Sequence, residues 1–218
     1  MSILSRVVGL ISAESGEKSE RAPHFAVMSP ISERADEKKI LLGLFENGLS
    51  AFHLRRPRWP IARVKAWLEE LPPQIRSRVI LHQFPQLVRR CGAGGFHIDH
   101  GEKLPLAAKE LGEISARCED FQSMLKVAKF AHRIMLGPVF PPEKYDVTVP
   151  RRTLEEYAAC ARYWRAHGGK NQMLAFGGVN EENVKNCRKA GFDGFVAVGA
   201  VWDADSPVKA FKKLLRKW

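Results

Sequence analysis

The sequence has few cysteines and no close cysteine pair. Its four cysteines are far apart along the chain, and none has the Cys or His spacing of a zinc site. We therefore expect buried free thiols in a reducing compartment, and neither a disulfide framework nor a zinc motif. The cysteines are Cys91, Cys118, Cys160 and Cys187.

Long hydrophobic runs are also absent. No apolar stretch approaches the roughly 20 residues that span a bilayer, because Arg, Lys or Gly interrupts each one. Near the N-terminus, Arg6 precedes a short apolar run that Glu14 follows closely, which is a poor match to a secretory signal. The sequence therefore predicts a cytoplasmic protein that makes no membrane contact.

Acidic residues are outnumbered by basic ones. The chain has 35 Lys and Arg against 24 Asp and Glu, a formal net charge of +11, which favours an anionic partner. No nucleic-acid-binding motif is recognised, and part of the excess lies on the polar face of a last helix, Pro207 to Lys217. We therefore expect a small phosphorylated partner and no nucleic acid. A basic nucleic-acid binder is the least favoured alternative, and a steep loss of affinity with salt would identify it.

Short apolar runs alternate with amphipathic ones after an N-terminal extension of residues 1–22, and this alternation favours βαβ units in residues 23–218. Eight strands are predicted at Phe25–Ser29, Ala51–Arg55, Arg78–His82, Phe96–Asp99, Glu113–Ala116, Ile134–Gly137, Met173–Phe176 and Phe195–Gly199. The predicted helices are Asp36–Glu46, Ile61–Glu70, Phe84–Arg90, Asp120–Ala128, Leu154–His167, Glu181–Ala190 and Pro207–Lys217.

One joint between helix and strand recurs three times. A glycine ends the helix and a phenylalanine opens the next strand at 48–52, 92–96 and 191–195. If these phenylalanines face the helices, alternation turns the polar strand residues toward the other side. We predict that Phe52, Leu54, Phe96 and Ile98 face the helices and that His53, Arg55, His97 and Asp99 point inward.

Polar inward residues fit the interior of a closed barrel better than an open sheet, which buries both strand faces in aliphatic side chains. The predicted fold is therefore a single (β/α)8 TIM barrel in the α/β class. An inward Arg55 would need a partner, and Asp99 could supply it in a purely structural ion pair.

Two glycine-containing loops follow the seventh and eighth predicted strands, where such barrels often hold phosphate. Without a Cβ, the backbone at these loops can approach an anion closely. We therefore predict a phosphate site at Gly177, Gly178, Gly199 and Ala200. A proline-stiffened loop after the sixth strand could carry Lys144 over the same site, although prolines also rigidify loops for stability alone.

Five segments occur in the order, and near the spacing, of the thiamine phosphate synthase and thiazole tautomerase superfamily, which the chain resembles from about His24 to Phe211. The resemblance implies a (β/α)8 barrel that acts on phosphorylated thiazole or pyrimidine compounds. The segments are Phe52-His-Leu-Arg-Arg56, Gly94-Gly-Phe-His-Ile98, Gly137-Pro-Val-Phe-Pro141, Phe176-Gly-Gly-Val-Asn180 and Val196-Ala-Val-Gly-Ala200.

In the synthase, as the resemblance implies, a Gln-x-Arg-x-Lys strand end and magnesium on aspartates hold the departing pyrophosphate. Here His53, Arg55 and Pro57 occupy those three positions. His82-Gln83 replaces the Asn-Asp pair after the third strand, and Glu102 could substitute for a later acidic ligand only with a register shift. Magnesium is implied but Gln83 argues against it, so we predict no cofactor, no metal and weakened synthase chemistry.

The tautomerase branch needs a general acid or base just after the fifth strand. Glu119 stands at that position in place of histidine, and His53 or His82 could take the proton-transfer role. We expect catalysis, where present, to use Arg55, His53, His82 and Glu119. The alternatives are a tautomerase-like isomerase and a non-catalytic phosphate-binding barrel. The oligomeric state, a homodimer included, stays open.

Overall fold

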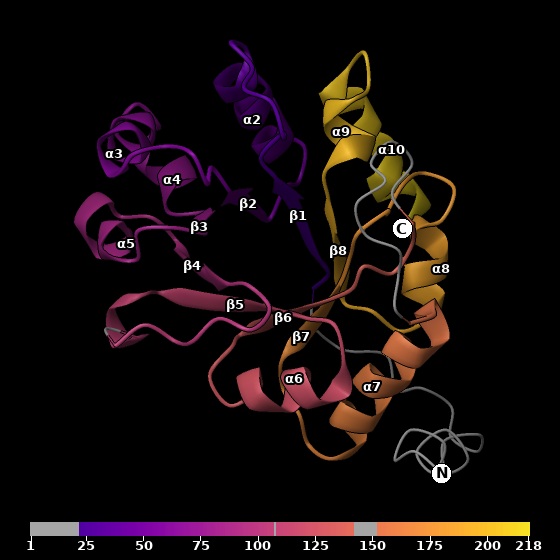
Figure 1. The fold of residues 1–218 in the computed structure, drawn as a ribbon. Helices are drawn as coiled ribbons and strands as arrows, with labels where there is room; N and C mark the ends of the chain where they lie inside the picture. The colour runs from indigo at the N-terminus through magenta and orange to yellow at the C-terminus, as the bar shows by residue number, and fades with distance from the viewer. Residues whose placement is uncertain (1–21, 107, 142–151) are drawn as a thin grey trace.

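A computed structural model describes residues 22–106, 108–141 and 152–218 and shows a closed barrel of eight parallel strands in sequential order (Figure 1). The predicted (β/α)8 fold is confirmed. Lys144 and most of the predicted N-terminal extension lie outside the described residues. The strands are β1 (His24–Met28), β2 (Ala51–Leu54), β3 (Val79–Leu81), β4 (Gly95–Ile98), β5 (Glu113–Cys118), β6 (Arg133–Leu136), β7 (Gln172–Phe176) and β8 (Gly194–Ala197).

Helices surround the strands (Figure 1), and local capping fixes where two of them begin. Asp120 and Thr153 each accept a hydrogen bond from the backbone three residues on, in reciprocal capping boxes. Within the described ranges no helix is both long and apolar enough to cross a membrane. The helices are α2 (Glu37–Glu46), α3 (Ile61–Glu69), α4 (Pro73–Arg76), α5 (Gln86–Cys91), 3-10 helix η1 (Ala108–Glu110), α6 (Phe121–Val127), α7 (Leu154–Ala166), α8 (Val184–Lys189), α9 (Gly199–Trp202) and α10 (Pro207–Lys217).

The strand register agrees with the prediction. Phe52 stacks on Trp67 of α3 at a ring distance of 5.9 Å, so its side chain lies between the sheet and the helices. Leu54, Phe96 and Ile98 belong to the same large core between strands and helices. A second, smaller core fills the barrel interior and contains Ala26, Met28, Met135, Leu174 and Val196.

Several predicted boundaries are wrong at the ends of elements. The eighth strand stops at Ala197, and Gly199 begins α9 instead of ending the strand. Phe84 has a positive φ of 58°, so the helix predicted from this residue begins only at Gln86. Arg55 and Asp99 lie just beyond β2 and β4, where the alternation of a strand no longer sets their direction.

Candidate functional site

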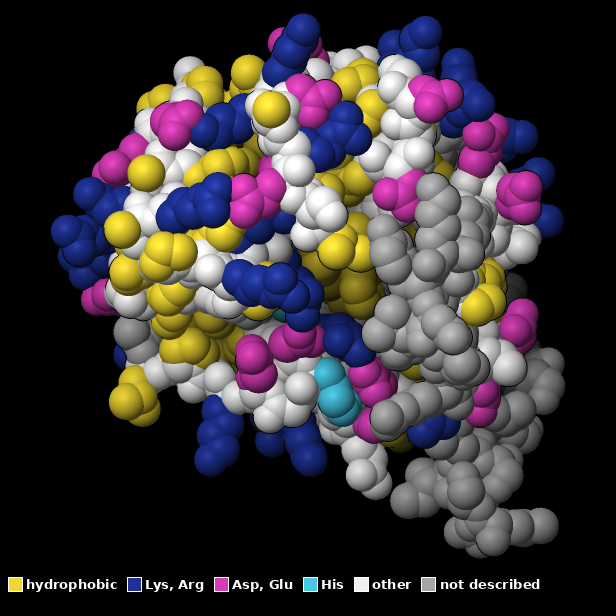
Figure 2. Space-filling view, turned by 45° about the horizontal axis from the view of Figure 1, so that its top comes forward, with side chains coloured by type: hydrophobic (Ala, Val, Ile, Leu, Met, Phe, Trp, Pro, Cys, Tyr) yellow, Lys and Arg dark blue, Asp and Glu magenta, His cyan; other side chains and the backbone are white. Residues whose placement is uncertain are grey.

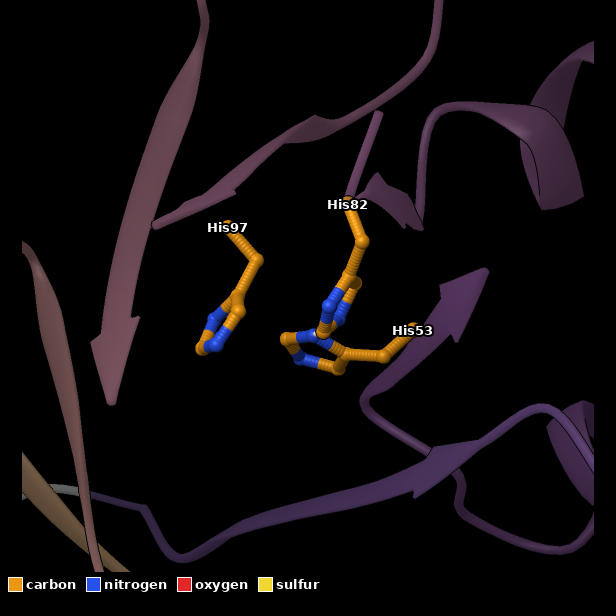
Figure 3. Close-up of side chains that lie close together, drawn as sticks. All are labelled: His53, His82 and His97. Atoms are coloured by element: carbon orange, nitrogen blue, oxygen red, sulfur yellow. Dashed lines mark hydrogen bonds between the residues drawn. The ribbon is translucent and has the colours of Figure 1, made fainter. Parts of the chain in front are cut away.

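Three neighbouring strands bring three histidines together inside the barrel. His53 is on β2, His97 is on β4 and His82 directly follows β3. Figure 3 shows the three rings turned toward one another. All three are buried, with exposed fractions of 2%, 1% and 9% for His53, His97 and His82.

The contacts among these rings are close. His53 Nδ1 lies 3.2 Å from His82 Nε2, a hydrogen bond whose donor depends on the tautomers. The rings of His82 and His97 stack at 4.2 Å with an interplanar angle of 29°. His97 Nδ1 lies 2.9 Å from the Ser115 hydroxyl of β5, which anchors that ring. The three side chains therefore form one cluster rather than three separate packing residues.

The cluster is held neutral by its surroundings. Burial, with the neighbouring histidines adding to it, lowers the pKa values of His53 and His82 well below the usual 6.5. Burial also lowers the pKa of His97 to about 4, although the charge of Asp99 opposes the shift. Neutral imidazoles are proton acceptors and metal ligands, so the cluster is not an anion-binding cation patch.

Arg117 occupies the barrel mouth, and the sequence prediction missed it. Its guanidinium donates to Asp99 at 3.1 Å and also pairs with Glu119. Burial disfavours the Asp99 carboxylate, but the His100 amide and Arg117 together bring the pKa of Asp99 below its usual value. The alternation from Ser115 to Arg117 along β5 was the signal that could have revealed this inward arginine.

Arg55 does not form the ion pair with Asp99 that the sequence suggested. Its side chain is exposed just beyond the end of β2 and makes no ion pair with any described residue, although its charge acts on Asp99 and His97. The interior partner of Asp99 is Arg117 instead. Arg56 is the buried member of this segment, and it pairs with Glu37 of α2 in a structural ion pair.

The Gly177–Gly178 loop and the start of α9 at Gly199 and Ala200 lie side by side, because β7 and β8 pair with Phe176 beside Val196. The four predicted phosphate-binding residues that the structure describes are half-buried, so solvent reaches both segments. Within the described part of the chain, nothing accepts a hydrogen bond from the amides of Gly177, Gly178, Gly199 or Ala200. Unsatisfied backbone donors in two adjacent segments suit an anion.

The carboxylates at the mouth do not fit a magnesium ion. The Gln83 Oε1 atom accepts a hydrogen bond from the Arg56 amide, and Glu102 accepts one from the Asp99 amide. The Arg117 guanidinium already occupies the place between Asp99 and Glu119. A magnesium site needs oxygen ligands that are open to the ion, and here the Arg117 guanidinium or a backbone amide already engages them.

A surface pocket of about 680 Å³ lies at the other end of the barrel, beside the starts of β6 and β7. Its lining includes Arg133 and Gln172 but none of the predicted site residues. Figure 2 shows basic and acidic side chains interspersed on one face of the molecule, around a recessed hydrophobic patch. A continuous patch of positive charge is not visible on this face.

Comparison with known proteins identifies relatives. A family model described as thiamine monophosphate synthase matches residues 25–201. The thiamine-phosphate synthase of Archaeoglobus fulgidus is 26% identical over 132 residues, which are 56% of this chain and 57% of that protein. The thiamine-phosphate synthase of Methanobrevibacter smithii is 22% identical over 196 residues, which are 84% of this chain and 90% of that protein.

Solved structures share the fold. Thiamine phosphate pyrophosphorylase from Bacteroides thetaiotaomicron superposes with a TM-score of 0.71 at 23% identity, over 89% of this chain and 96% of that chain. The protein of the same name from Pyrococcus furiosus superposes with a TM-score of 0.73 at 19% identity, over 89% of this chain and 94% of that chain. At such identities the likeness shows the barrel and not the chemistry.

Proposed function

Because the chain belongs to the thiamine monophosphate synthase family, we propose that it binds a phosphorylated thiazole or pyrimidine at the barrel mouth with weak synthase chemistry. The observation that carries the proposal is the set of four unpartnered amides in the loop after β7 and at the adjacent start of α9. A phosphate there accepts their hydrogen bonds, while the heterocycle lies over the mouth. Exposed Arg55 supplies a further positive charge near the mouth and forms no ion pair with any described carboxylate, although its charge acts on Asp99.

Weak synthase chemistry follows from the shortage of free positive charge at the barrel mouth. A departing pyrophosphate needs several cations, but two carboxylates already neutralise Arg117. Pro57 supplies no charge at the position where the family resemblance implies a lysine. Loss of one preorganised electrostatic contact typically lowers turnover by roughly 10² to 10³. We therefore expect the protein to bind the phosphorylated compound but to catalyse the synthase reaction slowly.

A binding titration tests the first half of the proposal. We expect thiazole phosphate at about 100 times its dissociation constant to raise stability by about 2.7 kcal/mol, and the unphosphorylated alcohol to have little effect. Arg55→Gln should weaken binding of the phosphate compound. Arg90→Gln, which alters an exposed arginine on α5, is the matched control and should not. Equal binding of phosphate and alcohol contradicts the proposal.

A turnover assay tests the second half of the proposal, that the synthase chemistry is weak. With saturating magnesium, coupling of pyrimidine pyrophosphate to thiazole phosphate should run at least about 100-fold slower than in the Methanobrevibacter smithii relative. Pro57→Lys should raise turnover, because it adds a cation at an exposed turn position. Pro57→Gln removes the proline without adding charge and should leave turnover low. Turnover equal to that of the relative would show that the missing contacts do not matter.

A further inference from the structure

We propose that His53, His82 and His97 form a binding site for one divalent transition-metal ion of the zinc class inside the barrel. These residues are the only described group of three or more His, Cys, Asp or Glu side chains that could hold a metal ion. One ligand atom from each lies within 4.8 Å of the others. The site differs from the magnesium arrangement that the family resemblance implies, both in its residues and in its ligand chemistry.

The distances are near those that coordination requires. Zinc–nitrogen bonds of about 2.0–2.1 Å at tetrahedral angles separate two ligand nitrogens by about 3.3 Å. His53 Nδ1 and His82 Nε2 are already 3.2 Å apart. The ion would replace the hydrogen bond between these two atoms. The ring that donates this bond would change tautomer, so that each of the two rings carries its proton on its other nitrogen.

His97 supplies the third ligand after a small rotation. Its Nδ1 is engaged by Ser115, so Nε2 is the nitrogen that remains for the ion. Because the His82 and His97 rings now stack, the His97 ring must turn for its lone pair to converge with the other two. The hydroxyl of Ser115 orients the ring in the way that second partners commonly orient metal-bound histidines.

Ligand chemistry selects the class of ion. Imidazole nitrogen suits zinc, copper, nickel and iron, whereas magnesium and calcium prefer oxygen. Three protein ligands leave the fourth position of a tetrahedral ion for water or a ligand atom, as in catalytic zinc sites. The charges of Arg55 and Arg117 act on His97, so we expect weaker binding than in a closed structural zinc site.

Metal titration of the full chain tests this site independently of the proposed function. The protein, prepared without a histidine tag and stripped with a chelator, is titrated with cobalt(II) and then with zinc. We expect one equivalent of cobalt(II) per chain, a visible spectrum of low-symmetry nitrogen coordination, and loss of that spectrum when zinc displaces it. Millimolar magnesium should not compete. Binding of well below one equivalent by correctly folded protein overturns the proposal.

Variants test whether the metal ion binds at the three histidines. His53→Gln and His97→Gln should each weaken cobalt(II) binding by more than tenfold, while His24→Gln, at another buried barrel histidine, should leave it unchanged. Ser115→Ala should weaken binding by roughly 10- to 100-fold and retains all three ligands, so it serves if a histidine variant fails to fold. Unchanged affinity in folded His53→Gln and His97→Gln, or in Ser115→Ala, overturns the assignment.

Discussion

His24 illustrates how a single residue couples this fold to pH. It opens β1 at the end of the barrel opposite the mouth, and its Nε2 atom is buried without a hydrogen-bond partner. Burial, followed by the charges of Arg133 and Arg78, lowers the pKa of His24 from 6.5 to about 3. Glu113 pairs with Arg133 nearby but does not reverse this effect.

The sign of the resulting pH dependence follows directly. Between about pH 6.5 and pH 3 the unfolded chain holds a proton on His24 that the folded chain does not, so folding stability falls as the pH falls. We expect His24→Leu to flatten the stability curve by about 1 kcal/mol per pH unit in this window. Urea unfolding from pH 7 to pH 4 measures it, and an unchanged m-value would show that the unfolded reference state is the same. A slope equal to that of the unaltered chain contradicts the burial argument.

At the scale of the element, the loop after β7 combines backbone conformation with close packing. Gly178 has a φ of +63°, and a Cβ at this position would lie 2.5 Å from the Phe140 carbonyl oxygen. The loop therefore packs against the segment after β6, which is hydrogen-bonded to it through the Phe140 amide and the Gly177 carbonyl. These contacts hold the amides of the proposed phosphate site in place.

The loop can be tested with a matched pair of glycines. Gly101 has a φ of +82° and open space where a Cβ would lie. Gly101→Ala should therefore lower folding stability only by the left-handed backbone penalty of about 1 kcal/mol. Gly178→Ala adds a clash with backbone and should cost about 2 kcal/mol more, while weakening phosphate binding. Thermal unfolding and a phosphate titration measure both effects. Equal losses for the two variants would mean that the close approach is unimportant.

At the scale of the whole molecule, the barrel is complete only because β8 pairs with β1. Here Gly194 lies opposite His24, and a Cβ on it would approach the His24 carbonyl oxygen to 1.8 Å. Gly95 has the same role between β4 and β5, where a Cβ would meet the Glu113 carbonyl oxygen. Both glycines let neighbouring strands approach at the N-terminal end of the barrel.

The close pairing of β8 with β1 predicts that one added methyl group has a large effect on stability. Gly194→Ala should destabilise the fold by about 3 kcal/mol or more, because backbone rather than a flexible side chain must move. Gly168→Ala, at an exposed glycine of positive φ with nothing nearby, is the control and should cost about 1 kcal/mol. Denaturant unfolding compares them. A Gly194→Ala protein as stable as the control would show that the backbone of β8 and β1 can move apart at little cost.

The sequence by itself determined the barrel, because information about strands and helices is local and repeats along the chain. Alternation within β2 and β4 was enough to turn His53 and His97 inward, and the phenylalanine positions fixed the register. The glycines after β7 and β8 could be identified from the sequence for the same reason, because each follows closely after its strand.

Only the tertiary structure decided which charged and titratable groups meet. Arg117 lies 18 residues from Asp99 in the chain, and His82 lies 29 from His53. Arg55 and Arg56 are adjacent, yet one is exposed and the other buried against Glu37, because a chain leaving a strand no longer alternates. Side-chain pairing across strand ends depends on barrel closure and register together, which no local pattern encodes.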